Sequence, residues 1–255
     1  MLSVTPIPAF SDNYIWLLRQ DTSPEVCVVD PGDATPVIEL LEREGLTLST
    51  VLITHHHPDH TGGLRELIER YSPRVVGPAN PDITGIDESV ADGDELRVMG
   101  RLFEVIEVPG HTLDHIAFFT AGIPPLLFSG DAIFSAGCGR LFEGTPAQMH
   151  ASLARLATLP EDTLVFAAHE YTLANLRFAL AADPHNPDVV QAMEECQRAR
   201  ELDRPTLPST LAREKRINPF LRVADAGVRE AASAHGDTDT DEATFTTLRA
   251  WKDNF

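Results

Sequence analysis

The chain has 255 residues, of which 43% are apolar and 23% charged, close to the values of soluble globular proteins. Its 20 Lys and Arg residues against 39 Asp and Glu residues give a formal net charge of −19, which opposes binding to nucleic acid because that partner needs a basic surface. No stretch has the roughly 20 apolar residues of a membrane helix, and the first ten residues lack the pattern of a secretory signal. We therefore expect a globular protein of one or two domains with no membrane partner.

Short apolar runs alternate with helix-like segments over the first two thirds of the chain. Apolar residues three and four apart predict helices around 37–41 and over 62–71, and Thr145 followed by Pro146 is typical of the start of a third. Most of the apolar runs are bounded by Gly, Pro or Asp, as strands are. We expect strands at Tyr14–Leu18, Val26–Asp30, Val51–Thr54, Val75–Gly77, Phe103–Val108, Ile116–Phe119, Leu126–Ser129 and Leu164–Ala168.

The pattern changes after about Tyr171. Segments 172–182, 187–203 and 241–252 are helix-like, and no strand is expected among them. We therefore predict an α/β domain over residues 1–172, with helices covering a sheet, followed by a smaller all-α domain over residues 173–255.

The three cysteines are not spaced as a disulfide framework. Cys27, Cys138 and Cys196 are odd in number and contain no CxxC pair, so we expect free thiols in a cytoplasmic protein.

The strongest chemical signal is the segment His55-His56-His57-Pro58-Asp59-His60, which directly follows the apolar run Val51–Ile53. His55 and His57 are two residues apart, so in an extended segment they point to the same side, and His56 points away. Asp59 and His60 follow at the turn before a helix. Four good metal ligands therefore gather at one strand-to-helix turn.

Three further ligand types stand just past the ends of apolar strands: His111, Asp131 and His169. If those strands share one sheet edge, all seven groups converge. Seven ligands exceed one tetrahedral zinc, and catalytic zinc leaves a position open for water. Imidazole and carboxylate suit Zn, Fe or Mn. We expect two divalent metal ions with Asp131 between them, the first held by His55, His57 and His111 and the second by Asp59, His60 and His169.

These residues resemble the metallo-β-lactamase superfamily and, more narrowly, the hydroxyacylglutathione hydrolase family, also called glyoxalase II. The superfamily signature is the HHHPDH segment with His111, Asp131 and His169. The narrower resemblance extends over nearly the whole chain and includes Asp12-Asn13-Tyr14, CGRLFEGT at 138–145, His169-Glu170-Tyr171-Thr172 and the basic residues near the end.

The resemblance implies an αββα sandwich, then a helical domain, and a site with two metal ions, usually zinc. It also implies that a glutathione thioester is held by Arg140, Leu141, Phe142, Tyr171, Arg249 and Lys252. Some members carry Lys and Tyr where this chain has Arg140 and Phe142, so the positive charge is kept and one hydroxyl contact is lost. Asp114 stands where a small residue is usual.

The implied reaction is hydrolysis of S-D-lactoylglutathione to glutathione and D-lactate, the second step of methylglyoxal degradation, by a hydroxide that bridges the metals. Asp59 and Asp131 are the expected catalytic carboxylates, besides being ligands. Asp30 and His115 are candidates for orienting the metal ligands. We expect a monomer that binds a small molecule.

Three other interpretations remain open. A persulfide dioxygenase of the same fold would use a single iron and would lack the helical domain. A metal-dependent nuclease would need a basic stripe, which this acidic chain does not have. A silent metal-binding module would be expected to have lost some of the seven ligands.

Overall fold

The computed structural model describes residues 2–255. The chain forms two compact units, the first made of residues up to Glu107 together with Asp114–Gly130, and the second of Val108–Leu113 and Asp131–Phe255. These units divide the chain at positions other than residue 172, and the boundary there stays a prediction.

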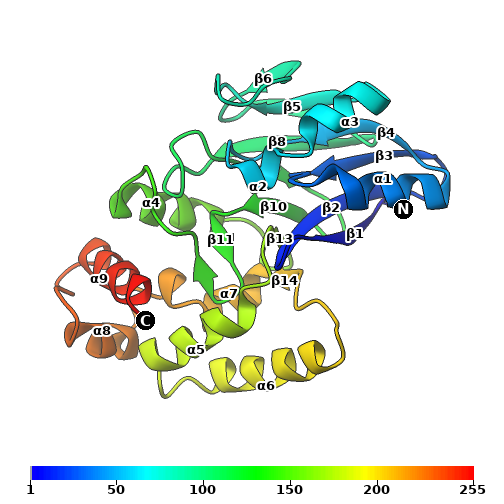
Figure 1. Ribbon diagram of the computed structural model, residues 1–255. Coiled ribbons are helices and arrows are strands. Elements are labelled where there is room, and N and C mark those ends of the chain that lie inside the picture. The colour runs from blue at the N-terminus through cyan, green and yellow to red at the C-terminus, as the bar shows by residue number, and fades with distance from the viewer. Residues whose placement is uncertain (1) are drawn as a thin grey trace. The chain divides into compact units, whose positions relative to one another are not determined.

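The first unit contains a six-stranded sheet in the order β1-β2-β3-β4-β5-β6 (Figure 1). Strands β1, β2 and β3 pair antiparallel, and β3 to β6 pair parallel. The four strands expected in this part of the chain are confirmed as β2 to β5. The bounds are β1 Leu2–Ala9, β2 Asn13–Gln20, β3 Glu25–Val29, β4 Thr47–Leu52, β5 Arg74–Pro78 and β6 Glu88–Val90.

Strand β1 is missing from the sequence-based prediction because Pro6 and Pro8 interrupt its pattern. Proline cannot donate a hydrogen bond to a neighbouring strand, so within sheets it is confined mainly to edges. Strand β1 is such an edge, since only β2 pairs with it in the sheet order.

Helices α1 (Ala34–Glu44) and α3 (Leu64–Tyr71) cover one face of this sheet. Their apolar stripes, such as Val37, Leu41 and Leu67, join the inward side chains of β2 to β5 in one buried core. The Asp33 carboxylate caps the first turn of α1, and Gly45 ends that helix in the left-handed conformation.

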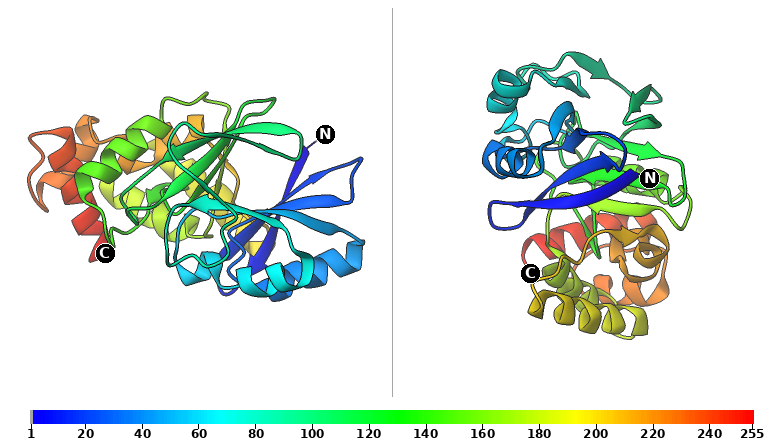
Figure 2. Two further views of the ribbon diagram at one scale, coloured as in Figure 1. Left: turned by 90° about the horizontal axis from the view of Figure 1, so that it is seen from above. Right: turned by 90° about the vertical axis from the view of Figure 1, so that its right-hand side faces the viewer.

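An antiparallel ladder forms the second layer of the first unit. It runs in the order β10-β9-β8-β7 and lies on the side of the sheet opposite α1 and α3 (Figure 2, left). Every residue of β9 and β10 is buried. The bounds are β7 Glu95–Val98, β8 Arg101–Glu107, β9 Ile116–Thr120 and β10 Leu126–Gly130.

The second unit is mostly helical and builds its core from α5, α6, α7 and the short hairpin of β11 and β12. Stacked and edge-on contacts among Phe178, Phe220, Phe245 and Trp251 tie α9 to that body. The bounds are β11 Ile133–Phe134, β12 Gly137–Cys138, α4 Pro146–Leu156, β13 Leu164–Ala167, α5 Thr172–Ala182, α6 Pro187–Glu201, β14 Ser209–Thr210, α7 Leu211–Ile217, α8 Ala226–Ser233 and α9 Asp241–Asp253.

The expected helices at 172–182, 187–203 and 241–252 are confirmed as α5, α6 and α9, whereas α7 and α8 were not predicted. The expectation that no strand follows Tyr171 is wrong, because β14 pairs antiparallel with β13. With two residues, β14 is too short to show a period. Within residues 2–255, no helix combines the length and the apolar character needed to cross a bilayer.

Candidate metal and substrate site

Parallel pairing of β3 with β4 sets the position of the first group of ligands. The Asp30 N–H donates to Leu52 O at 2.9 Å, so the residues that follow the two strands lie side by side. Gly32 in the loop after β3 is pressed against the backbone of Asp59, where a Cβ atom would stand 1.8 Å from the carbonyl oxygen. Only glycine allows this approach.

Asp30 is the centre of the hydrogen bonds behind these ligands. Its carboxylate accepts from the Thr54 N–H at 2.8 Å and from the Thr54 hydroxyl at 2.7 Å, and it lies 3.1 Å from Nδ1 of His60. Because a carboxylate accepts, His60 carries its proton on Nδ1 and keeps the Nε2 lone pair. The Thr54 hydroxyl donates its hydrogen to Asp30 and therefore accepts from Nδ1 of His55 at 3.0 Å, so that Nε2 of His55 carries no proton either.

The spacing of the expected ligand atoms in the first unit fits tetrahedral ions, one for each of the two pairs. Zinc bonds of about 2.0–2.1 Å place neighbouring ligand atoms about 3.3–3.4 Å apart. His55 Nε2 lies 3.2 Å from His57 Nδ1, and His60 Nε2 lies 3.4 Å from Asp59 Oδ2. Asn13 donates from Nδ2 to the same Asp59 oxygen at 3.0 Å and so fixes that carboxylate.

His56 turns away from this group, as its position in the segment predicts. Its Nδ1 lies 3.0 Å from Asp114 Oδ1, while Asn80 donates to the other Asp114 oxygen at 2.8 Å. Asp114 therefore joins the ligand loop to the loop after β5. His115 is fully buried and stacks on His55 with ring centroids 4.6 Å apart, so it fixes the orientation of that ring.

The second unit holds the remaining three expected ligands, His111, Asp131 and His169. Asp131 is buried, and its two oxygens face different histidines: Oδ2 lies 3.3 Å from His111 Nε2 and Oδ1 lies 3.3 Å from His169 Nε2. His111 donates from Nδ1 to the Arg140 carbonyl at 2.8 Å, and this leaves the Nε2 lone pair toward Asp131. The chemistry and spacing of these donors fit divalent metal ions in both units.

The segment around Gly139 is packed tightly against these ligands. A Cβ atom at Gly139 would lie 2.1 Å from the Asp131 carbonyl oxygen and 3.1 Å from His111 Nδ1. The Phe142 N–H donates to the His111 carbonyl at 3.2 Å. The CGRLFEGT segment thus contacts His111 through several of its residues, and this explains why the segment belongs to the sequence pattern of the site.

Among the residues expected to hold the substrate, Arg140, Leu141 and Phe142 follow β12. Arg140 and Phe142 are exposed, and the Phe142 ring meets His111 edge-on with centroids 5.3 Å apart. Tyr171 stacks on His169 at 4.7 Å with the rings nearly parallel, at 6°. These aromatic contacts place two of the expected substrate residues directly against expected metal ligands of the same unit.

Arg249 and Lys252 lie on α9 in different surroundings. Arg249 is 4% exposed, and its guanidinium bonds to protein acceptors. Lys252 is half-buried, with Nζ 5.1 Å from the centre of the Phe178 ring. Burial, with a smaller contribution from the Arg249 charge, lowers the pKa of Lys252 to about 8.

Sequence reasoning gave no role to Glu214, which is fully buried in α7. Its carboxylate accepts from the Ala136 N–H at 2.7 Å and from the hydroxyls of Ser135 and Ser209, and Asn218 donates to it at 3.3 Å. Burial raises the pKa of Glu214. A charged residue inside an otherwise ordinary helical pattern gives no local signal of burial, so this hub could not be found from the sequence.

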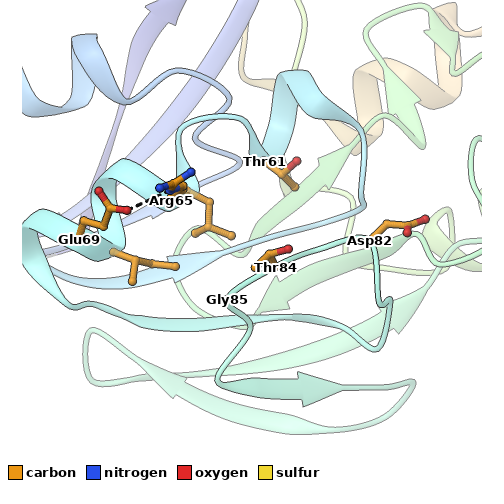
Figure 3. A pocket seen from close by; sticks show the side chains of 8 residues that line it. Thr61, Arg65, Glu69, Asp82, Thr84 and Gly85 are labelled. Atoms are coloured by element: carbon orange, nitrogen blue, oxygen red, sulfur yellow. Dashed lines mark hydrogen bonds and ion pairs between the residues drawn. The ribbon is translucent and has the colours of Figure 1, made fainter.

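A cavity of about 630 Å³ in the first unit lies elsewhere, between α3 and the loop after β5 (Figure 3). Figure 3 shows Arg65 and Glu69 of α3 on one wall, with Asp82 and Thr84 on the loop. None of its eight lining residues is an expected ligand or substrate residue.

Comparison with known proteins identifies the family of this chain. Residues 10–169 match the family model described as the metallo-beta-lactamase superfamily, and residues 170–255 match the model described as the hydroxyacylglutathione hydrolase C-terminus. A curated hydroxyacylglutathione hydrolase of Chromohalobacter salexigens is 66% identical over 255 residues, covering 100% of both chains.

Two solved structures share the fold. ETHE1 from Myxococcus xanthus has a TM-score of 0.65 and 27% identity, covering 92% of this chain and 100% of that one. TTHA1623, solved in a di-iron-bound form, has a TM-score of 0.60 and 25% identity, covering 85% of this chain and 100% of that one. The expected family and fold class are confirmed, and the His and Asp groups can hold divalent metal. The chain belongs to the hydroxyacylglutathione hydrolase family of the metallo-β-lactamase superfamily.

Proposed function

We propose that this protein hydrolyses the thioester of S-D-lactoylglutathione, giving glutathione and D-lactate in the degradation of methylglyoxal. The observation that carries this proposal is the 66% identity, over the full length of both chains, to a curated hydroxyacylglutathione hydrolase. The match of residues 170–255 to the C-terminal model of that family supports the substrate class, because the superfamily signature alone does not select one.

The proposed centre holds two divalent metal ions, with zinc as the first choice and iron or manganese as alternatives. Asp131 supports a bridge because each of its oxygens faces a different histidine at 3.3 Å. The relative TTHA1623, in its di-iron-bound form, supports the number of ions. The proposed ligands are His55, His57 and His111 for one ion and Asp59, His60 and His169 for the other.

When bound, the metal ions supply an activated water at neutral pH and polarise the thioester carbonyl. The protein's own part is to orient the metal-binding side chains and to set which ring nitrogen of each histidine carries the proton. Asp30 fixes the proton of His60 and, through Thr54, that of His55, while the Arg140 carbonyl fixes that of His111. Asn13 holds the Asp59 carboxylate, which orients the attacking water in this proposal.

The leaving group places little demand on the protein. A thiol has a pKa of about 8.5, so the thiolate of glutathione leaves without a strong general acid. The proposed scheme therefore needs no further general acid. With water as the nucleophile, it needs no Ser or Cys nucleophile either.

The proposed contacts to the glutathione part come from the second unit. Glutathione is a net anion, and a guanidinium suits a carboxylate because it offers a fork of two N–H donors. We assign the direct contacts to exposed or half-buried residues that border His111 and His169 or lie on α9: Arg140, Leu141, Phe142, Tyr171 and Lys252. The helical domain proposed over residues 173–255 then serves substrate binding, with Arg249 beside Lys252 on α9 as the further proposed contact.

We also propose that the protein acts in the cytoplasm, as a monomer, without a nucleic-acid partner. Its three cysteines are free and buried, which suits a reducing compartment. The net charge of −19 opposes a polyanionic partner.

The test is turnover by the purified protein with its metal content measured. The substrates are S-D-lactoylglutathione, a β-lactam, a glutathione persulfide and a short RNA. We expect the thioester to be hydrolysed fastest, with about two divalent ions per chain. Faster consumption of the persulfide than of the thioester would overturn the proposal.

His169→Gln and His150→Gln form a matched pair of variants for this assay. His169 is an expected ligand, whereas His150 stacks on Phe245 in the same unit, with ring centroids 5.4 Å apart. We expect the first change to remove metal and activity and the second to leave both in place.

A further inference from the structure

The hairpin of β11 and β12 begins and ends against a proposed metal ligand. Asp131 stands two residues before β11, and the Gly139 N–H after β12 donates to the Ala132 carbonyl at 3.3 Å. Gly139 is also pressed against the Asp131 carbonyl oxygen. Between these ends, the Phe134 ring meets the His169 ring edge-on, with centroids 5.9 Å apart. The position of this hairpin therefore constrains where Asp131 lies relative to His169.

The turn of the hairpin is buried, although connecting segments normally run over the surface of a protein. Ser135 is 4% exposed and Ala136 is fully buried. Ala136 also has a φ of 55°, a left-handed conformation that is unfavourable for a residue with a Cβ atom. A buried turn of this kind persists only where the surrounding structure holds it and supplies partners for its main-chain groups.

Buried side chains from α5 and α7 supply two of those partners. Asn175 of α5 donates from Nδ2 to the Ser135 carbonyl at 3.0 Å. The Glu214 carboxylate of α7 accepts from the Ala136 N–H at 2.7 Å. The helices thus satisfy both a carbonyl and an N–H group at the tip of the hairpin.

Asn218, directly after α7, holds the two sides of the turn together. Its Oδ1 accepts from the Phe220 N–H at 3.1 Å, and this fixes the orientation of the amide group. Nδ2 therefore points to the hairpin, where it donates to the carbonyls of Phe134 at 3.2 Å and Gly137 at 2.9 Å. These two residues face each other across the hairpin, so one amide group contacts both strands. The three buried side chains that hold the turn form the hairpin anchor: Asn175, Glu214 and Asn218.

Glu214 also joins the hairpin to the strand pair that leads to His169. Its Oε1 accepts from the hydroxyls of both Ser135 and Ser209. Ser209 lies in β14, which pairs with β13, and β13 ends two residues before His169. One buried carboxylate therefore connects the segment that follows Asp131 with the segment that precedes His169.

We propose that the hairpin anchor is a positioning device for Asp131 and His169, with Glu214 as its central residue. The inference rests on the metal centre of the proposed function and deepens it. Asp131 Oδ1 and His169 Nε2 lie 3.3 Å apart, and loss of the anchor lets this separation vary. Metal binding then weakens, because groups that orient a ligand are worth about 10–100-fold in affinity.

The test measures the binding of Zn²⁺ alone to Glu214→Ala and Glu214→Gln. Glutamine keeps an oxygen for the Ala136 N–H, and its NH₂ group donates to the hydroxyls of Ser135 and Ser209, which rotate to accept. We expect the Kd of the more weakly bound ion to rise about tenfold in Glu214→Ala and to stay within about threefold in Glu214→Gln. Competition with a fluorescent chelator, at a temperature where every variant is folded, measures both.

Asp183→Asn separates positioning from a general loss of stability. Asp183 is a buried carboxylate of the same unit that accepts from Asn186 and Arg222. We expect this variant to melt at a lower temperature and to bind Zn²⁺ with an unchanged Kd. The inference is overturned if Asp183→Asn weakens Zn²⁺ binding as much as Glu214→Ala does, or if folded Glu214→Ala keeps the Kd of the unmodified protein.

Asn175→Ala keeps the test decisive if Glu214→Ala does not fold. Alanine is a good helix former, so α5 tolerates the change, while the Ser135 carbonyl loses its donor. We expect faster amide hydrogen exchange in a peptide covering residues 132–139 of the metal-free protein, together with a higher Kd for Zn²⁺. Unchanged exchange and an unchanged Kd would contradict the anchor. If the unmodified protein binds Zn²⁺ but hydrolyses no thioester, the proposed function fails, and the Kd values of the variants still test the anchor.

Discussion

Asp30 lies 3.1 Å from Nδ1 of His60, and both side chains are buried. The carboxylate is not itself an expected ligand, yet it decides which nitrogen of His60 is free to bind metal. For Asp30→Asn we expect metal affinity to fall by about 10–100-fold, since an amide can present its NH₂ group to Nδ1 and reverse the tautomer. Competition with a fluorescent chelator measures the change.

Asp114→Asn is the matched control for Asp30→Asn. Asp114 also accepts from a histidine of the same segment, but that histidine is His56, which is not an expected ligand. Metal affinity should stay within about threefold of the unmodified protein, well below the effect of orienting a ligand. An equal loss in both variants would mean that Asp30 acts on the loop as a whole and not on the tautomer of His60.

The two carboxylate oxygens of Asp131 face two different histidines, so the proposed centre depends on both oxygens of this one side chain. Asp131→Asn replaces one oxygen with an NH₂ group that cannot bind metal. We expect the metal content to fall to one ion per chain or fewer and kcat to fall by about 100-fold or more. Elemental analysis after gel filtration measures the first, and the thioester assay the second.

Asp183→Asn is the control for Asp131→Asn. Asp183 is a buried carboxylate of the same unit, paired with Arg222. Its replacement should lower the melting temperature and leave the metal content unchanged. Two ions retained by Asp131→Asn would rule out Asp131 as the bridge.

As a proposed contact to glutathione, Lys252 is expected to give substrate binding a pH dependence. Its pKa is lowered to about 8, so the ammonium is present below pH 8 and is lost as the pH rises through that value. We expect the Kd of a non-hydrolysable S-alkyl glutathione to rise by roughly three- to tenfold between pH 7 and pH 9, as a charge-assisted hydrogen bond is lost. Calorimetric titration measures this without interference from the pH dependence of turnover.

Lys252→Arg tests the cause of that pH dependence. Arginine stays charged throughout this range, so its Kd should be nearly flat from pH 7 to pH 9. A Kd that rises equally in Lys252→Arg would assign the pH dependence to a different group.

Glu214 supports the fold of the second unit. Glu214→Ala leaves the Ala136 N–H and the hydroxyls of Ser135 and Ser209 without their acceptor in a buried place. We expect the free energy of unfolding to fall by about 2–4 kcal/mol, measured by urea denaturation. Glu161→Ala is the control, because Glu161 is exposed and its carboxylate pairs with Lys215 at the surface, and its effect should stay within about 0.5 kcal/mol. Equal effects would show that Glu214 contributes no more than a surface charge.

Much of the architecture could be predicted from local sequence patterns. Val51–Ile53 followed by HHHPDH indicates a buried strand and a turn rich in ligands, and β4 ends at Leu52 just before that turn. Thr145-Pro146 indicates the start of α4, where the structure has a capping box. Such signals are readable because strand alternation, helix period and capping involve residues within a few positions of one another.

The sequence alone also determined the identity of the ligand types and the opposite orientation of His56, since both follow from residue chemistry and from spacing along one segment. Only the tertiary structure decided what stands behind them. The acceptors of Arg249 lie 111 and 110 residues away in the chain, and Asp114 meets His56 across 58 residues. Contacts over such separations depend on where the folded chain returns, and no local period reports that. The same holds for Arg249. Its position near the end of an acidic chain suggests a solvent-exposed cation, and only the packing of the folded chain buries it.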